Sequence, residues 1–169
     1  MNTEVRLKEL GLELPEVPKP VTEYLPAKRV GDFVYVSGQG PIRDGKPVYV
    51  GRVGAEVSPE DAYKAAQICA VNCLAAVKSL VGSLNAVEEI VQVRGFVNSA
   101  PDFHDQPQVI SGASELLVKV FGERGRHIVF LQLFLIFLQR FSERATQIGN
   151  REVMRCLIGH NLSKTVGGV

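Results

Sequence analysis

The sequence lacks the excess of charge that proteins binding nucleic acid or a membrane surface usually carry. Its 169 residues contain 19 Lys and Arg against 18 Asp and Glu, which gives a formal net charge of +1. A near-neutral chain sets up no field that would attract a phosphate backbone or an anionic lipid surface. We therefore expect neither nucleic acid nor a membrane as a partner.

Cysteine is also scarce, and its number, three, is odd. The polar residues 1–5 lack the apolar segment of a secretory leader. The longest apolar run, residues 128–138, is interrupted by Gln132 and is shorter than the roughly 20 residues that span a bilayer. These absences favour a reducing, cytoplasmic location, with one domain large enough to build a hydrophobic core.

The most informative segment present is a strand-like run that stops at a serine and two glycines. Residues 33–36 are Phe, Val, Tyr and Val, and Ser37, Gly38, Gln39 and Gly40 follow. Glycine permits unusual φ values and close approach, so such a stop leaves backbone N–H groups without ladder partners. We expect a polar nook that holds a carbonyl or carboxylate oxygen; a bulge or turn without a ligand is the alternative.

Two further segments accompany this strand end. Tyr24 precedes it, and Gly-Phe-Val-Asn-Ser-Ala-Pro-Asp-Phe follows at 95–103. In this order and spacing they resemble the RidA/YjgF family of reactive-intermediate (imine/enamine) deaminases, also called the endoribonuclease L-PSP or chorismate-mutase-like family. The motifs Leu-Gly-Leu-Glu-Leu-Pro at 10–15 and Gly-Ala-Ser-Glu-Leu at 112–116 are similar to one branch. The resemblance covers about residues 10–127.

The resemblance implies a function and a set of site residues. Members hydrolyse enamine or imine acids of the 2-aminoacrylate type to 2-keto acids, without a cofactor or a metal, in a cleft between the subunits of a homotrimer. Tyr24 would offer a hydroxyl near the small-molecule substrate. Ser37 and the Gly38 N–H would hold an oxygen or the catalytic water. Phe103 would form a wall of the pocket, and Ser111 stands where relatives often carry Asn.

This chemistry also requires a fixed carboxylate, an aimed water and a proton relay. In relatives an Arg after the second helix binds the carboxylate, and a Glu on the last strand positions water. No residue matches either, and Arg124 and Arg126 are interpreted as solvated loop charges. A non-catalytic member that binds a small ligand or a protein is therefore the alternative. A ribonuclease gains little support, because residues 1–127 are net acidic.

The residue pattern predicts an α+β fold of the chorismate-mutase-like type, with two helices on one face of a mixed sheet. Glycine and Asp at 31–32 and 44–45 mark hairpin turns, and Ser58 before Pro59 marks a helix start. The expected elements are a proline-punctuated lead-in over 1–20, two strands within 21–36, a hairpin about 44–45, a helix over 58–81, a strand over 87–98, and a helical region from 100 to 121.

The composition changes after His127. An almost unbroken apolar run follows over 128–141, and residues 128–169 carry five basic and two acidic side chains. We divide the chain into a family-like domain, 1–127, and a tail, 128–169. The run is interpreted either as a strand over 128–134 or as a helix over about 128–148, and its length favours the helix. A true variant would account for the tail, and so would a frameshift, a retained intron or a gene-model error; the other reading frames of the coding DNA distinguish them.

Two groups of reactive side chains are assigned structural roles. Cys69 and Cys73 share a helix face at i, i+4, but no further Cys or His has ligand spacing, so we interpret them as buried apolar residues. Asp102, His104 and Asp105 precede a helix, where acids interact with its dipole. The three histidines of the chain do not form a recognisable Ser-His-Asp pattern.

Overall fold

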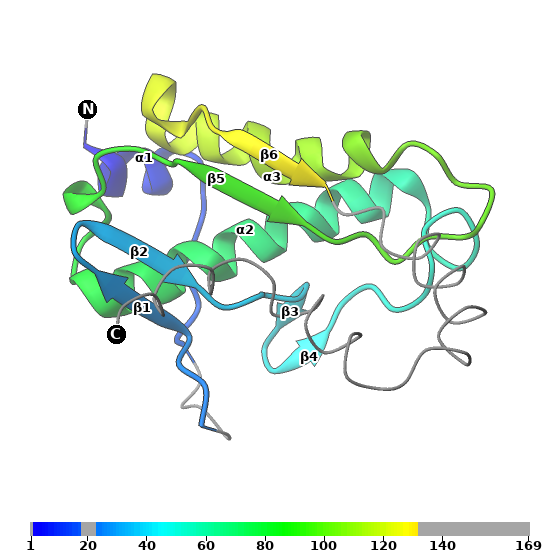
Figure 1. The fold of residues 1–169 in the computed structure, drawn as a ribbon, viewed down its shortest axis with the longest axis horizontal. Helices are drawn as coiled ribbons and strands as arrows, with labels where there is room; N and C mark the ends of the chain where they lie inside the picture. Colours follow the sequence, from blue (N-terminus) through cyan, green and yellow to red (C-terminus); the bar gives the residue numbers. More distant parts are fainter. Residues whose placement is uncertain (1, 18–22, 132–169) are drawn as a thin grey trace, which may run out of the picture. The chain divides into compact units, whose positions relative to one another are not determined.

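The computed structural model describes residues 2–17 and 23–131, and two long helices form its centre (Figure 1). Helix α2 (Pro59–Val81) begins after Ser58, whose hydroxyl accepts a hydrogen bond from the Asp61 N–H, and ends at Gly82 with φ of 82°. Helix α3 (Gln106–Phe121) ends at Gly122 with φ of 65°. Both predicted helices are therefore confirmed, although α3 starts six residues later than the predicted region.

The contact between α2 and α3 is made by small residues. The buried face of α2 carries Ala62, Ala66 and Ala70, and α3 opposes it with Gly112 and Ala113. A Cβ built on Gly112 would collide with the backbone carbonyl of Tyr63. The two backbones thus approach closely because neither side presents a bulky group. By length and composition alone α2 could cross a membrane; its alanine face, however, belongs to the core that it shares with α3.

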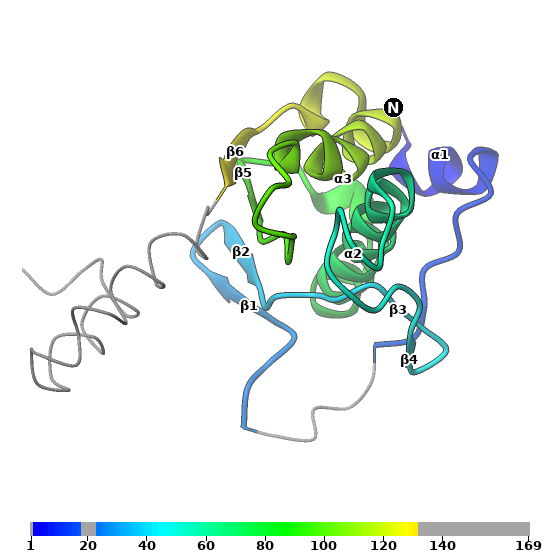
Figure 2. The same ribbon diagram turned by 90° about the vertical axis from the view of Figure 1, so that its right-hand side faces the viewer.

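The strands of the described residues form three separate two-stranded ladders. β1 (Ala27–Val30) pairs with β2 (Phe33–Val36), and β3 (Ile42–Arg43) with β4 (Lys46–Pro47), both antiparallel; β5 (Gln92–Gly95) and β6 (Ile128–Leu131) are parallel. Figure 2 shows β1, β2, β5 and β6 on one side of α2 and α3, and helix α1 (Thr3–Glu9) on the other. The α+β class is confirmed, with the sheet divided into ladders.

Alternation along β1 and β2 separates an inner face from an outward face. Ala27 is buried and Val34 and Val36 are half-buried, whereas Lys28 and Val30 oppose Tyr35 and Phe33 across the ladder and are exposed with them. On β5 the same alternation leaves Gln92 and Arg94 exposed, and on β6 Ile128, Val129 and Phe130 are all exposed. We call the exposed side of these four strands the outward face.

Three predictions about local structure require correction. The predicted strand over 87–98 is confined to β5, which follows the 3-10 helix η1 (Leu84–Ala86) after five residues. Its flanks bond to other segments instead: the Ile90 N–H donates to the Arg124 carbonyl, and the Asn98 carbonyl accepts from the Val53 N–H. The favoured helix from about residue 128 does not start there; residues 128–131 form β6 beside β5, as the strand alternative over 128–134 predicted for this part of it. The rest of that expected helix lies outside the described residues.

The third correction concerns the N-terminus, where the lead-in contains α1. Only Thr3 and Leu7 of this helix are buried, so its sequence lacks the apolar stripe that predicts a helix. It is instead defined by its cap, because the Asn2 side chain accepts hydrogen bonds from the Glu4 and Val5 N–H groups.

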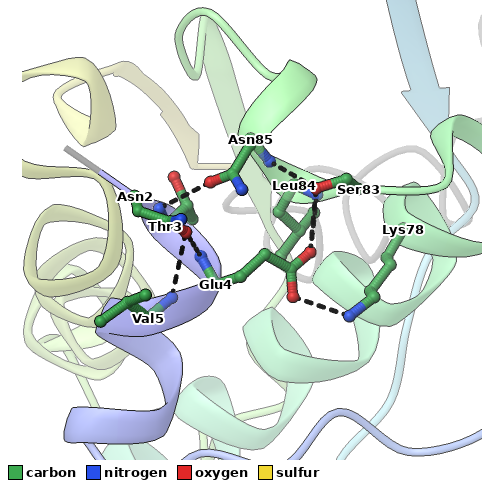
Figure 3. A network of polar contacts seen from close by, with 8 residues as sticks. All are labelled: Asn2, Thr3, Glu4, Val5, Lys78, Ser83, Leu84 and Asn85. Atoms are coloured by element: carbon green, nitrogen blue, oxygen red, sulfur yellow. Dashed lines mark hydrogen bonds and ion pairs between the residues drawn. The ribbon is translucent and has the colours of Figure 1, made fainter.

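Glu4 connects α1 to the segment that follows α2 (Figure 3). Its carboxylate pairs with Lys78 Nζ at 2.7 Å and accepts hydrogen bonds from the Leu84 N–H at 3.0 Å and the Ser83 hydroxyl at 3.3 Å. The hydrogen bond from Lys78 and that from Leu84 lower the pKa of Glu4 below its ordinary value of 4.5. The ionised form is therefore the one that stabilises the anchor.

We expect the Glu4→Gln variant to lower the free energy of unfolding by about 1 kcal/mol at pH 7, because the ion pair with Lys78 is lost. Since the folded-state pKa is lowered, this contribution is complete above the unfolded pKa and disappears as the pH falls through the folded value. Thermal melts of both proteins from pH 7 to pH 3 should converge at low pH. Glu9→Gln, on an exposed pair of the same helix, is the control; a constant Glu4→Gln deficit would contradict this account.

Candidate functional site

A hollow of about 360 Å³ lies beside the end of β2 and the start of β1. Its lining combines two charged side chains, a hydroxyl, a phenol and two aliphatic groups: Glu23, Leu25, Lys28, Tyr35, Val36 and Ser37. The hollow coincides with the strand end that the sequence singled out, and Ser37 is the predicted site residue that it contains.

Ser37 is held by the segment before β1. Its hydroxyl donates to the Leu25 carbonyl at 2.6 Å, and its N–H donates to the Pro26 carbonyl at 3.0 Å. The expectation of an unpaired N–H is therefore wrong at Ser37, because the β1–β2 pairing continues one residue past the ladder. The Ser37 oxygen keeps its lone pairs, so it can accept a further hydrogen bond from a ligand or water.

Gly38 follows Ser37 and, unlike it, is not held by a hydrogen bond from its N–H. Its N–H makes no hydrogen bond within the described part of the chain, and a Cβ built on it would meet no atom within 4 Å. Neither Gly38 nor Gly40 adopts a positive φ. The expected unusual φ is thus absent, and what Gly38 provides is an accessible backbone donor.

Tyr24 lies between two lining residues but is not itself part of the lining. Its side chain is 63% exposed in the single protomer. Phe103 is half-buried against the core and Gly54, and the Ser111 hydroxyl donates to the Pro107 carbonyl of α3 at 3.0 Å. Of the described residues proposed for the site, only Ser37 thus lines the hollow of the protomer. Tyr24 and Gly38 are sequence neighbours of residues that line it.

The two loop arginines differ. Arg126 is exposed and pairs with Glu123 at 2.8 Å. Arg124, in contrast, donates to the Val87 carbonyl at 3.0 Å and to the Thr3 hydroxyl at 3.3 Å. The interpretation of Arg124 as a solvated charge is therefore wrong: it ties the 3-10 helix η2 (Gly122–Gly125) to α1 and to the chain after η1.

Cys69 and Cys73 are half-buried on α2. Burial raises the pKa of each thiol to about 11, so both are protonated at neutral pH. Within residues 2–17 and 23–131, no cluster of three or more His, Cys, Asp or Glu side chains is arranged to hold a metal ion.

The structure contains a Ser–His pair that the sequence analysis did not predict. The Ser114 hydroxyl of α3 lies 3.0 Å from His127 Nε2, and His127 Nδ1 lies 2.6 Å from the Gly125 carbonyl oxygen. Because that carbonyl can only accept, the geometry assigns the proton to Nδ1 and makes Nε2 the acceptor for Ser114. The pair does not line the hollow, and it fastens the start of β6 to α3.

Short strands beside a two-helix layer define an α+β protein of the chorismate-mutase-like fold. The chain belongs to the YjgF family, since the family model described as "YjgF/chorismate mutase-like, putative endoribonuclease" matches residues 4–136. The family resemblance predicted from the sequence is thereby confirmed.

Individual relatives agree with this assignment. The chain is 37% identical over 122 residues to Protein TCP17 of Trypanosoma cruzi, a match covering 72% of this chain and 76% of that protein. A solved "putative endoribonuclease" of Shewanella oneidensis MR-1 superposes with a TM-score of 0.75 at 35% identity, covering 78% of this chain and 87% of that one. The protein Atu1372 of Agrobacterium tumefaciens, described as of unknown function, gives 0.69 at 43% identity, with coverage of 77% and 80%.

We expect Ser37→Ala to lower the free energy of unfolding by about 0.5–1 kcal/mol, because the bond from its hydroxyl to the Leu25 carbonyl is lost. Amide hydrogen exchange at residue 37, whose N–H bonds to Pro26, should accelerate. Ser79→Ala removes a comparable hydroxyl bond, to the Ala76 carbonyl at 2.9 Å, and serves as the control. Unchanged exchange at residue 37 in Ser37→Ala would show that the hydroxyl does not hold this segment.

Proposed function

We propose that the protein hydrolyses small enamine or imine acids of the 2-aminoacrylate type to 2-keto acids and ammonia. The observation that carries the proposal is the placement of Ser37 and Gly38 at a strand end beside a polar hollow, in a chain of this family. In the reaction, an enamine first tautomerises to the imine as its terminal carbon gains a proton and its nitrogen loses one. Water then adds to the imine carbon, the C–N bond breaks, and ammonia leaves as the carbonyl forms.

The groups near the hollow match parts of this reaction. The Gly38 N–H and the free lone pairs of Ser37 can hold a water or a developing oxygen near the imine carbon. The Tyr24 hydroxyl, exposed in the protomer, can donate a proton to the departing nitrogen once a neighbouring surface covers it. The apolar side chains of Leu25 and Val36 suit a short aliphatic substrate.

The proposal predicts that the protein accelerates the decay of 2-aminoacrylate generated in situ from serine by a dehydratase. Tyr24→Phe should reduce this acceleration by about tenfold or more, because it removes a proton donor. Tyr49→Phe, at a half-buried tyrosine that packs against the core, is the matched control. A decay rate equal to the uncatalysed rate with the wild-type protein would refute the proposed activity.

We further propose that the active form is a homotrimer with its site between subunits. The outward face supports this, since the β1–β2 ladder exposes Val30, Phe33 and Tyr35, and the β5–β6 ladder on the same side of the helices exposes Ile128 and Phe130 (Figure 2). Exposed apolar side chains gathered on one side of a protein are typical of an interface. A second subunit there would cover Tyr24, Tyr35 and the hollow, which in the protomer are open.

Light scattering of the full chain is expected to give three times the 18.5 kDa chain mass. Phe33→Asp, which places a charge on the outward face, should shift the mass toward that of a monomer without loss of helical circular dichroism. Val50→Asp alters a still more exposed apolar residue outside the four strands and should leave the mass unchanged. A monomeric wild-type protein would remove the between-subunit site.

A non-catalytic ligand-binding member is the second candidate. It is favoured by the absence of residues matching the family's carboxylate-binding Arg and water-positioning Glu. Binding of pyruvate without acceleration of 2-aminoacrylate decay would identify it. The ribonuclease activity named for the Shewanella protein has less support here, because residues 1–127 are net acidic.

A further inference from the structure

The residues that line the hollow include a lysine, Lys28. It carries a positive charge near the site, where no residue matches the carboxylate-binding arginine of relatives. Lys28 of β1 lies directly across the ladder from Tyr35. Tyr35 stands two residues before Ser37, so both lie on the outward face. Glu23 lines the same hollow. The lining therefore holds one positive group, one negative group and a hydroxyl around an apolar wall.

Neither charge is neutralised within residues 2–17 and 23–131. The side chains of Lys28 and Glu23 make no hydrogen bond or ion pair there, with each other or with any third side chain. The next residue shows the contrast: Arg29 points to the opposite face, where its Nε donates to the Gly31 carbonyl at 2.9 Å and its guanidinium pairs with Asp32 at 3.6 Å. Lys28 thus lines the hollow with an ammonium group that has no partner among the described residues.

We propose that Lys28 anchors the carboxylate of the ligand in this hollow, and that Glu23 faces the nitrogen-bearing end. This rests on the proposed function, whose substrate must have its carboxylate fixed before water attacks. A lysine ammonium carries three donors on a flexible stem and can follow a small carboxylate where a rigid bidentate arginine is missing. Two opposite charges around Leu25 and Val36 define the ligand class: small 2-imino, 2-amino or 2-oxo acids with a short aliphatic side chain.

Binding of pyruvate to the full chain, measured by calorimetry or by NMR titration, tests Lys28 independently of catalysis. Lys28→Met should weaken pyruvate binding by about tenfold or more, and Lys28→Arg should largely preserve it. Pyruvamide, which has the same shape without the charge, should bind wild type and Lys28→Met alike. Raising the ionic strength should weaken pyruvate binding to wild type but not to Lys28→Met.

The matched control is Arg29→Gln, which removes a cation from the adjacent position on the other face. It should leave pyruvate affinity unchanged. Lys28 is exposed, so its replacement should preserve the circular dichroism and melting temperature. Equal pyruvate affinity in wild type and Lys28→Met would overturn the assignment, as would failure of wild type to bind pyruvate at millimolar concentration.

Catalysis separates this inference from the proposed function. If 2-aminoacrylate decay is accelerated, Lys28→Met should raise KM with little change in kcat, as expected for a residue that holds the substrate in both ground and transition states. Lys28-dependent pyruvate binding with no acceleration would refute the deaminase activity while supporting the anchor. Acceleration with an unchanged KM in Lys28→Met would refute the anchor alone.

Discussion

The close contact between α2 and α3 is the constraint on which the rest of the structure depends. Gly112 allows the two backbones to approach, because any Cβ there would strike the Tyr63 carbonyl. The thin helix layer that results offers its flank to the inner residues of the strands, such as Ala27 and Val36. Because successive side chains of a strand point to opposite faces, burial of Ala27 turns its neighbour Lys28 outward. The direction of Lys28 therefore follows from packing on the other face of β1.

The strand end at Ser37 shows how one residue can serve both structure and a site. Its N–H and hydroxyl proton are used to hold residues 25 and 26, which shapes the hollow and leaves only the oxygen lone pairs for a ligand. The N–H of Gly38, one residue later, makes no hydrogen bond within the described residues, because the pairing has ended. The Ser37 oxygen, an acceptor, and the Gly38 N–H, a donor, are therefore adjacent in the chain. Only these groups are left for a ligand, because the ladder stops at this point.

Much of the fold was predictable, and the failures have physical causes. Hairpin turns at 31–32 and 44–45 and the Ser58 cap are local signals, and the structure confirms them. Helix α1 was missed because only two of its residues are buried. The strand β6 was the less favoured of two interpretations, because an apolar run is compatible with helix and strand alike. Of the site, the Ser37 region was identified from a motif. Lys28 was missed, because its position in the hollow depends on the β1–β2 register, although alternation from the turn at 31–32 would have placed it opposite Tyr35.

The charge balance of the hollow bears on how a member of this family could function without the usual arginine. A carboxylate ligand needs a nearby cation that the protein has not already neutralised, and Arg29, Arg124 and Arg126 are all committed to other partners. Lys28 differs because its strand neighbours across the ladder are Tyr35 and, diagonally, Phe33, neither of which carries an opposite charge.

In a solvent-exposed protomer such a lysine is well hydrated and attracts a carboxylate only weakly. Covering the outward face with a second subunit would displace that water and strengthen the attraction. Ligand affinity and subunit assembly would then be coupled through one side chain.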